Sequence, residues 1–290
     1  MSTVAAPRTS APAARASAPV ESELRGRWWR FTALLVITAV TIVPIVAVAY
    51  LSLQPALGSA VTAPFTFENY ANVFAQTNVL TWLGNSLVTT LITVVIAVAV
   101  AAPAGYVLSR GRNKLVSGYS LTLFIIQSLP VVTAVIPLFI LFARLHLVDS
   151  LTGLTIIYVG STMSVAIWMM AAYYDSIPIS LEEAAWMDGV SLFGGFVRIV
   201  LRNSLPGVLS TAIFAFLQGW NDYLIASVFL RSDYNYTLPI GVQTFFQQNS
   251  TNWGLVMAVA VVMMLPPVIV FGVLNRYFSV GGIGGSLTGR

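Results

Sequence analysis

Ser180 and the residues that follow it have the most specific spacing in the sequence. Glu183 comes three residues after Ser180, which is a capping box and predicts that a short helix begins at Ser180. Gly189 can adopt the left-handed conformation that ends such a helix, and Ser191 can cap a second helix. The pattern predicts a helix–turn–helix elbow, and its apolar content favours an elbow that docks on another surface.

A second candidate site is the run Trp220, Asn221, Asp222 and Tyr223, which lies within a later apolar stretch. An ionisable group in such a stretch is costly and usually faces a cavity or a partner. Aromatic faces together with amide and carboxylate hydrogen bonds suit a polyhydroxylated solute. The alternative is that Asp222 only holds two helices together. The sequence leaves both roles open.

Several other kinds of chemistry are excluded by the residues that the sequence lacks. It contains no cysteine and a single histidine, His146, so we expect no metal site. Its one lysine, Lys114, follows Asn113, so the Gly-Lys-Ser/Thr run of a P-loop is absent. We therefore expect no catalytic residues and no cofactor in this chain, and no nucleic-acid partner.

The composition is that of an all-α membrane protein, because 57% of the residues are hydrophobic and only 8% are charged, against about a quarter in soluble domains. Bilayer-spanning helices need about 20 mostly apolar residues. Six such spans are predicted, at residues 31–53, 82–109, 119–142, 151–174, 205–230 and 254–274. Pro130 lies inside the third span, and we interpret it as an ordinary kink.

The basic residues predict the orientation of these spans. Of the 14 lysines and arginines, all except Arg144 and Arg231 fall on one side when both termini are placed together. Basic residues favour the cytoplasmic side, so we expect both termini in the cytoplasm. The predicted organisation is a disordered cytoplasmic tail (1–30), a six-span domain (31–274) that includes the cytoplasmic loop 175–204, and a cytoplasmic C-terminal tail (275–290).

The chain also resembles a known family. Glu183-Ala184-Ala185, Gly189, Ile199 and Leu201 resemble the EAA loop of permease subunits in bacterial binding-protein-dependent ABC importers. The resemblance extends over most of the chain, through Asn85-Ser86-Leu87, Ile136-Pro137-Leu138 and Trp220-Asn221-Asp222, and points to the MalG-like, carbohydrate-importing branch. Arg202 stands where the family usually has proline.

The resemblance implies the ABC importer type I permease fold, in the bacterial cytoplasmic membrane. It implies a second homologous permease subunit, two ATPase subunits that bind ATP and Mg²⁺, and an extracytoplasmic solute-binding protein as partners. The residues that it implicates in ATPase coupling are Glu183, Ala184, Ala185, Asp188 and Gly189. The alternative is an ion-coupled secondary transporter without an ATPase. Inverted repeats would favour that alternative, and the sequence shows no convincing repeat.

Overall fold

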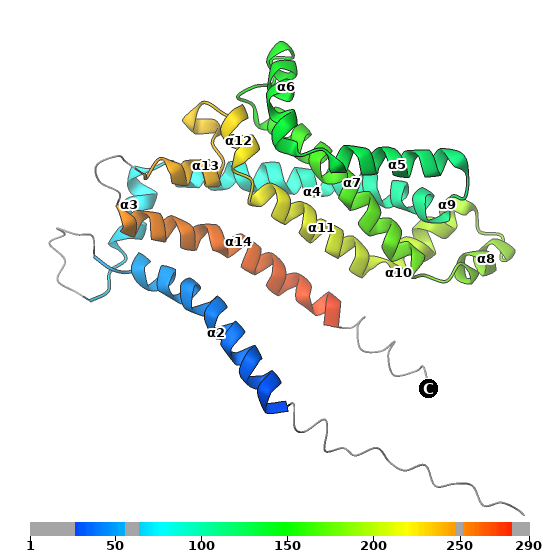
Figure 1. Cartoon of the computed structure of the whole chain (residues 1–290), viewed down its shortest axis with the longest axis horizontal. Helices are drawn as coiled ribbons and strands as arrows, with labels where there is room; N and C mark the ends of the chain where they lie inside the picture. The colour runs from blue at the N-terminus through cyan, green and yellow to red at the C-terminus, as the bar shows by residue number, and fades with distance from the viewer. Residues whose placement is uncertain (1–26, 56–63, 247–251, 280–290) are drawn as a thin grey trace, which may run out of the picture. The chain divides into compact units, whose positions relative to one another are not determined.

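The computed structural model describes residues 27–55, 64–246 and 252–279, and every regular element within these ranges is a helix (Figure 1). The all-α prediction is confirmed. The chain divides into two compact units, Met1–Ala47 and Val48–Arg290, which are described separately. Helix α2 begins at Arg27, inside the predicted tail 1–30, and the rest of that tail lies outside the described residues.

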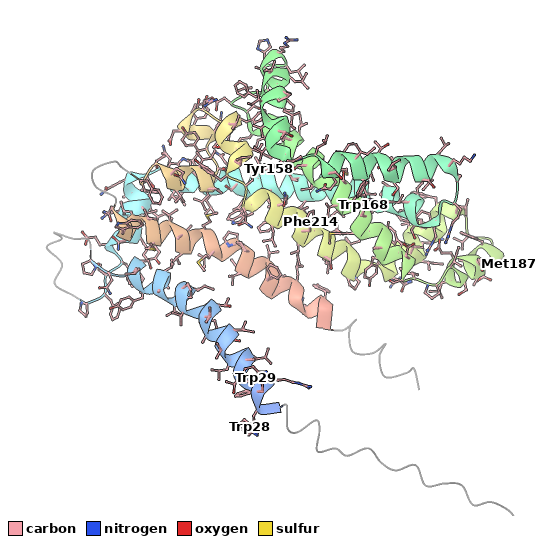
Figure 2. The ribbon with its side chains drawn as sticks, viewed as in Figure 1. Trp28, Trp29, Tyr158, Trp168, Met187 and Phe214 are labelled. Carbon is pink, nitrogen blue, oxygen red and sulfur yellow. The ribbon has the colours of Figure 1, made fainter. Side chains whose placement is uncertain are left out.

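The first unit contains most of helix α2 (Arg27–Ser52). This helix is long and apolar enough to cross a membrane. Trp28 and Trp29, at its start, are 75% and 76% exposed (Figure 2). An apolar helix of 26 residues with tryptophans at its start is typical of a span whose tryptophans lie at the headgroup layer.

Four of the predicted spans are single long helices: α2, α4 (Val79–Arg110), α7 (Leu151–Asp175) and α14 (Trp253–Ser279). Helix α14 continues past the predicted boundary at residue 274, and residues 280–290 of the predicted tail lie outside the described residues. The shorter elements are α3 (Glu68–Gln76), α8 (Ser180–Met187), α9 (Leu192–Gly195), the π-helix Phe196–Val200, α10 (Leu201–Asn203), the 3-10 helix Asp233–Asn235 and α13 (Leu238–Gln243).

The predicted span 119–142 consists of two helices rather than one. Helix α5 (Lys114–Ser128) and helix α6 (Val131–Arg144) meet at an angle of 94° (Figure 1). Pro130 has no amide hydrogen, and its ring disfavours the helical conformation at Leu129. The ordinary kink expected at this proline is therefore a break between two helices that differ in direction.

The predicted span 205–230 is likewise not one continuous helix. Helix α11 (Leu205–Trp220) ends at Trp220, and a separate helix, α12 (Leu224–Phe229), follows after three non-helical residues. The physical reason lies in Asp222, whose carboxylate accepts hydrogen bonds from the amides of Ile225 and Ala226. These bonds start a new helix and compete with continuation of the old one.

The core of the second unit lies where α4 packs against α7 and α11 (Figure 1). Helix α4 presents small side chains at this contact, and Thr93, Ala97 and Ala101 are fully buried. A Cβ added at Gly105 would lie 2.7 Å from Cβ of Met170, so only glycine permits this approach. Small residues that let backbones come close are a usual basis of helix association in lipid.

Candidate functional site

The predicted elbow exists, although its first helix is not capped as expected. Helix α8 begins at Ser180, but no side chain caps it. The amides of Glu182 and Glu183 both donate to the carbonyl of Ile179. The first turn therefore already includes Ile179, and Ser180 lies inside the helix rather than before it. The capping-box prediction is wrong for this reason.

The turn and the second part of the elbow follow the prediction. Gly189 has a φ of +84°, the left-handed conformation expected of it. Oγ of Ser191 accepts a hydrogen bond from the amide of Gly194 at 3.1 Å and so caps α9. The helical segment Leu192–Asn203, which includes a π-helical turn, then meets α11 at 74°.

The residues implicated in ATPase coupling lie mostly on the exposed side of this elbow. Glu183, Ala184, Asp188 and Gly189 are exposed, whereas Ala185 is buried. Met187 is 88% exposed at the outer edge of α8 (Figure 2). Further exposed apolar side chains of the elbow are Leu181, Leu192 and Phe193. A contiguous segment that exposes apolar side chains is typical of a protein or membrane contact.

The buried acid of the elbow is Glu182, which the sequence interpretation passed over in favour of Glu183. The side chain of Glu182 is 0% exposed and forms an ion pair with Arg110 of α4, with Nη2 and Oε1 at 2.8 Å. Nε of Arg110 donates to the same oxygen at 2.8 Å, and the Tyr106 hydroxyl donates to Oε2 at 2.6 Å. The available signal was the position of Tyr106 and Arg110, one helical turn apart at the end of a predicted span.

Asp222 makes contacts on two sides. Its Oδ2 accepts hydrogen bonds from the Tyr158 hydroxyl of α7 and from the amide of Ala226, each at 2.9 Å, and its Oδ1 accepts from the amide of Ile225 at 3.3 Å. The bond to Tyr158 links two helices, which is the role that the sequence offered as the alternative to contact with a solute. Asp222 also faces a cavity, so the geometry is compatible with both roles that the sequence left open.

That cavity has a volume of about 540 Å³ and lies at the end of α11. Its lining combines apolar and polar side chains: Phe214, Leu217, Gln218, Asn221, Asp222, Tyr223 and Leu224. Trp220 is not among them, because it is 1% exposed, stacks on Phe216 and donates from Nε1 to the carbonyl of Met263. The structure thus brings Asn221, Asp222 and Tyr223 together at the cavity and places Trp220 in the core behind them.

Comparison with known proteins assigns this arrangement to a family. Residues 101–280 match the family described as the binding-protein-dependent transport system inner membrane component. The chain belongs to this family. This permease is 32% identical over 241 residues to the inner membrane ABC transporter permease protein YcjP of Escherichia coli. The aligned residues make up 82% of this chain and 85% of YcjP.

Other relatives and one solved structure agree with this assignment. The permease is 34% identical over 218 residues to the maltodextrin transport system permease protein MalD of Streptococcus pneumoniae (74% and 77% of the two chains). It is 31% identical over 229 residues to the arabinooligosaccharides transport system permease protein AraQ of Halalkalibacterium halodurans (76% and 80%). A chain in the crystal structure of a bacterial ABC transporter involved in the import of the acidic polysaccharide alginate has the same fold. Its TM-score is 0.75 at 21% identity, over 91% of this chain and 100% of that one. The predicted ABC importer permease fold is confirmed.

The loop between α12 and α13 of the permease is held in place by Asp149, which lies between α6 and α7. The carboxylate of Asp149 accepts hydrogen bonds from the amides of Arg231 and Ser232, at 2.9 and 3.0 Å, and from the Ser232 hydroxyl. Asn235 donates from Nδ2 to the carbonyl of Asp149 at 2.6 Å. Burial raises the pKa of Asp149, but the bonds from Ser232 and its neighbours outweigh this effect and lower the pKa to about 2.

Proposed function

We propose that this permease is the non-catalytic transmembrane subunit of an ATP-driven importer and forms half of the translocation pathway for a carbohydrate or related polyhydroxylated solute. The names of its relatives support the solute class, since they describe maltodextrin and arabinooligosaccharide transport. The absent P-loop requires that separate ATPase subunits bind ATP and Mg²⁺. The remaining partners are a second, homologous permease and an extracytoplasmic solute-binding protein.

The observation that carries this proposal is the exposed apolar edge of the elbow. Met187 projects from a short helix whose opposite side is fixed to α4 by the buried Glu182–Arg110 pair. A surface that is apolar, rigidly held and outside the spans is suited to receive the ATPase. The basic asymmetry of the sequence supports a cytoplasmic position for this edge and for both termini, on the side where ATP is available.

The cavity beside Asp222 supports the solute class. Asn221, Asp222 and Gln218 offer amide and carboxylate groups to solute hydroxyls, and Tyr223 offers an aromatic face that is 44% exposed. Trp220 does not line the cavity but stabilises the end of α11 by stacking on Phe216. In this proposal the three cavity residues contact the passing solute, and Trp220 holds the end of α11 that carries them.

The test of the ATPase contact is the variant Met187→Glu in the complete transporter. Met187 is 88% exposed, so the change should disturb the packing within the chain very little. A carboxylate in an apolar contact loses its hydration without a partner, and ATPase binding should weaken by at least about tenfold. The measurement is co-purification of the ATPase with the tagged permease, together with solute uptake into vesicles.

The matched control is Leu115→Glu at the start of α5, because Leu115 is 83% exposed and lies outside the elbow. This variant should retain the ATPase. Equal retention of the ATPase by both variants would remove the elbow from the proposed contact. Uptake driven by an ion gradient in vesicles that lack ATP and the ATPase would instead favour a secondary transporter.

A further inference from the structure

The Glu182–Arg110 pair is more elaborate than the attachment of a surface loop requires. Glu182 uses both carboxylate oxygens, one toward Arg110 and one toward Tyr106. Arg110 also donates from Nη2 to the carbonyl of Ile177 at 3.1 Å and from Nη1 to Oγ of Ser109 at 3.2 Å. One guanidinium thus joins the end of α4, the segment before α8 and α8 itself.

A buried ion pair contributes little net stability to a fold, so stability alone does not explain this pair. Removing both charges from water is costly, and apolar side chains of similar volume often hold a contact equally well. A buried pair with several directed hydrogen bonds instead fixes the geometry, because the planar guanidinium accepts few orientations of its partner. The ring of Tyr106 adds to this restriction, since its centroid lies 4.8 Å from that of Phe196 in the second part of the elbow.

The end of α4 that carries the pair is also fixed to α7. Pro103 removes one backbone hydrogen bond of α4 and would allow a hinge there. The next turn is nevertheless held closely, because a Cβ at Gly105 would lie 2.9 Å from the carbonyl oxygen of Ile167. Oγ of Ser109 donates to Oδ1 of Asp175 at the end of α7, at 2.5 Å.

The opposite end of α4 holds the loop between α12 and α13. Nε1 of Trp82 donates to the carbonyl of Asp233 at 3.1 Å. Nδ2 of Asn85 donates to the carbonyls of Tyr234 and Tyr236, at 2.8 and 2.9 Å, and the amide of Leu238 donates to Oγ of Ser86. Helix α4 has 32 residues and so joins the two regions over about 48 Å.

We propose that Glu182, Arg110 and Tyr106 are positioning residues that make α8 and α4 a single rigid lever, so that a displacement of the elbow reaches the loop at residues 233–238 without an intervening joint. This inference rests on the proposed function, because the lever transmits force only when an ATPase moves the elbow. The lever requires that α8 keeps a constant distance from the end of α4 while the transporter changes state.

A spin-label experiment tests this rigidity directly. The chain contains no cysteine, so Val107→Cys and Leu181→Cys introduce a unique pair of labels at exposed positions, one on α4 and one on α8. In the complete transporter the distance between the labels should have one narrow distribution, identical without nucleotide and with a non-hydrolysable ATP analogue. A shift of that distribution between the two states would overturn the lever, and this measurement requires no variant of the pair.

The variant Glu182→Gln then tests the residues themselves. It preserves shape but loses the charge, so the label distribution should broaden and solute uptake per ATP hydrolysed should fall about tenfold while the ATPase stays bound. A merely structural role would lower the yield but leave the ratio of uptake to ATP hydrolysis unchanged. A wild-type ratio together with a narrow distribution would overturn the assignment.

The matched comparison is Glu183→Gln, which makes the same chemical change one residue later on the exposed side of α8. It should leave the label distribution narrow, whatever it does to ATPase binding. Broadening equal to that of Glu182→Gln would contradict the specific role of the buried pair. If no ATPase binds the wild-type chain, the proposed function fails, but the labels in the chain alone still report whether Glu182→Gln releases α8 from α4.

Discussion

Replacing Asp222 with asparagine tests whether this residue serves the solute, the fold or both. The change leaves the volume of the side chain almost unaltered but converts one acceptor oxygen into a donor. Asp222 accepts from Tyr158, Ala226 and Ile225, and at least one of these donors must then face an amide hydrogen. The bonds that remain also weaken, because a carboxylate accepts hydrogen bonds more strongly than a neutral amide oxygen does.

The magnitude follows from these three bonds. Hydrogen bonds to a charged group contribute about 1.5–3 kcal/mol each, against about 0.5–1.5 kcal/mol for neutral pairs. If the remaining oxygen keeps the two bonds of 2.9 Å as neutral bonds, each weakens by about 1 kcal/mol, and the lost bond of 3.3 Å removes about 1.5 kcal/mol more, so the free energy of unfolding should fall by about 3–4 kcal/mol. The assay is the thermal midpoint of the assembled transporter, measured beside solute uptake on the same preparation.

Tyr158→Phe is the matched control. Tyr158 is 2% exposed and does not line the cavity. This variant therefore removes the hydrogen bond between Tyr158 and Asp222 without changing a residue that lines the cavity. Both variants should lower the midpoint, but at equal amounts of assembled complex only Asp222→Asn should reduce uptake. Equal uptake by the two variants would refute the solute role of Asp222, and an unchanged midpoint in Asp222→Asn would refute its role in holding α12.

Three further predictions concern orientation, the turn of the elbow and pH. Single cysteines at Ser117 and Ser191 should react with an impermeant thiol reagent only from the cytoplasmic side, and one at Tyr234 only from outside. Labelling of Ser191 from outside would reverse the topology. At Gly189, φ is +84° and an added Cβ would meet no atom within 4 Å. Asparagine tolerates this φ and valine does not, so Gly189→Asn should retain the ATPase in a pull-down whereas Gly189→Val should lose much of it. Equal retention by the two variants would show that the geometry of the turn is unimportant. The stabilisation from Asp149, whose pKa in the folded chain is about 2, should be complete above its ordinary value of about 4 and should disappear as pH falls toward 2. Thermal midpoints of Asp149→Asn should show a weaker dependence on pH in that window, and an unchanged dependence would assign it to other groups.

The sequence predicted the features of this fold that depend on local composition. Long apolar stretches between charges were enough to locate α2, α4, α7 and α14, because lipid requires both the length and the polarity of such helices. Gly189 and Ser191 were predictable because a turn and a helix cap are determined by neighbouring residues.

Features that depend on tertiary partners were not predictable in the same way. The bond from Tyr158 to Asp222 joins residues 64 positions apart and has no local signal, whereas the break after Trp220 has one, because Asp222 accepts from the nearby amides of Ile225 and Ala226. Glu182 and Glu183 are adjacent and chemically identical, and only the position of α4 decides which one is buried. The exclusion of Trp220 from the cavity likewise depends on Met263 of α14, a helix distant in the sequence.

The break between α5 and α6 bears on how the cell makes this subunit. With 15 and 14 residues, these helices measure about 22 and 21 Å, so neither crosses a hydrocarbon layer of about 30 Å alone. The interrupted backbone at Leu129 and Pro130 cannot be left facing lipid, so it needs cover from protein or from a water-filled cavity. Under the proposed function the second permease supplies this cover, and a copy synthesised without it would leave the break exposed to lipid. We therefore expect the amount of this chain in the membrane to fall when the proposed second permease is not produced with it.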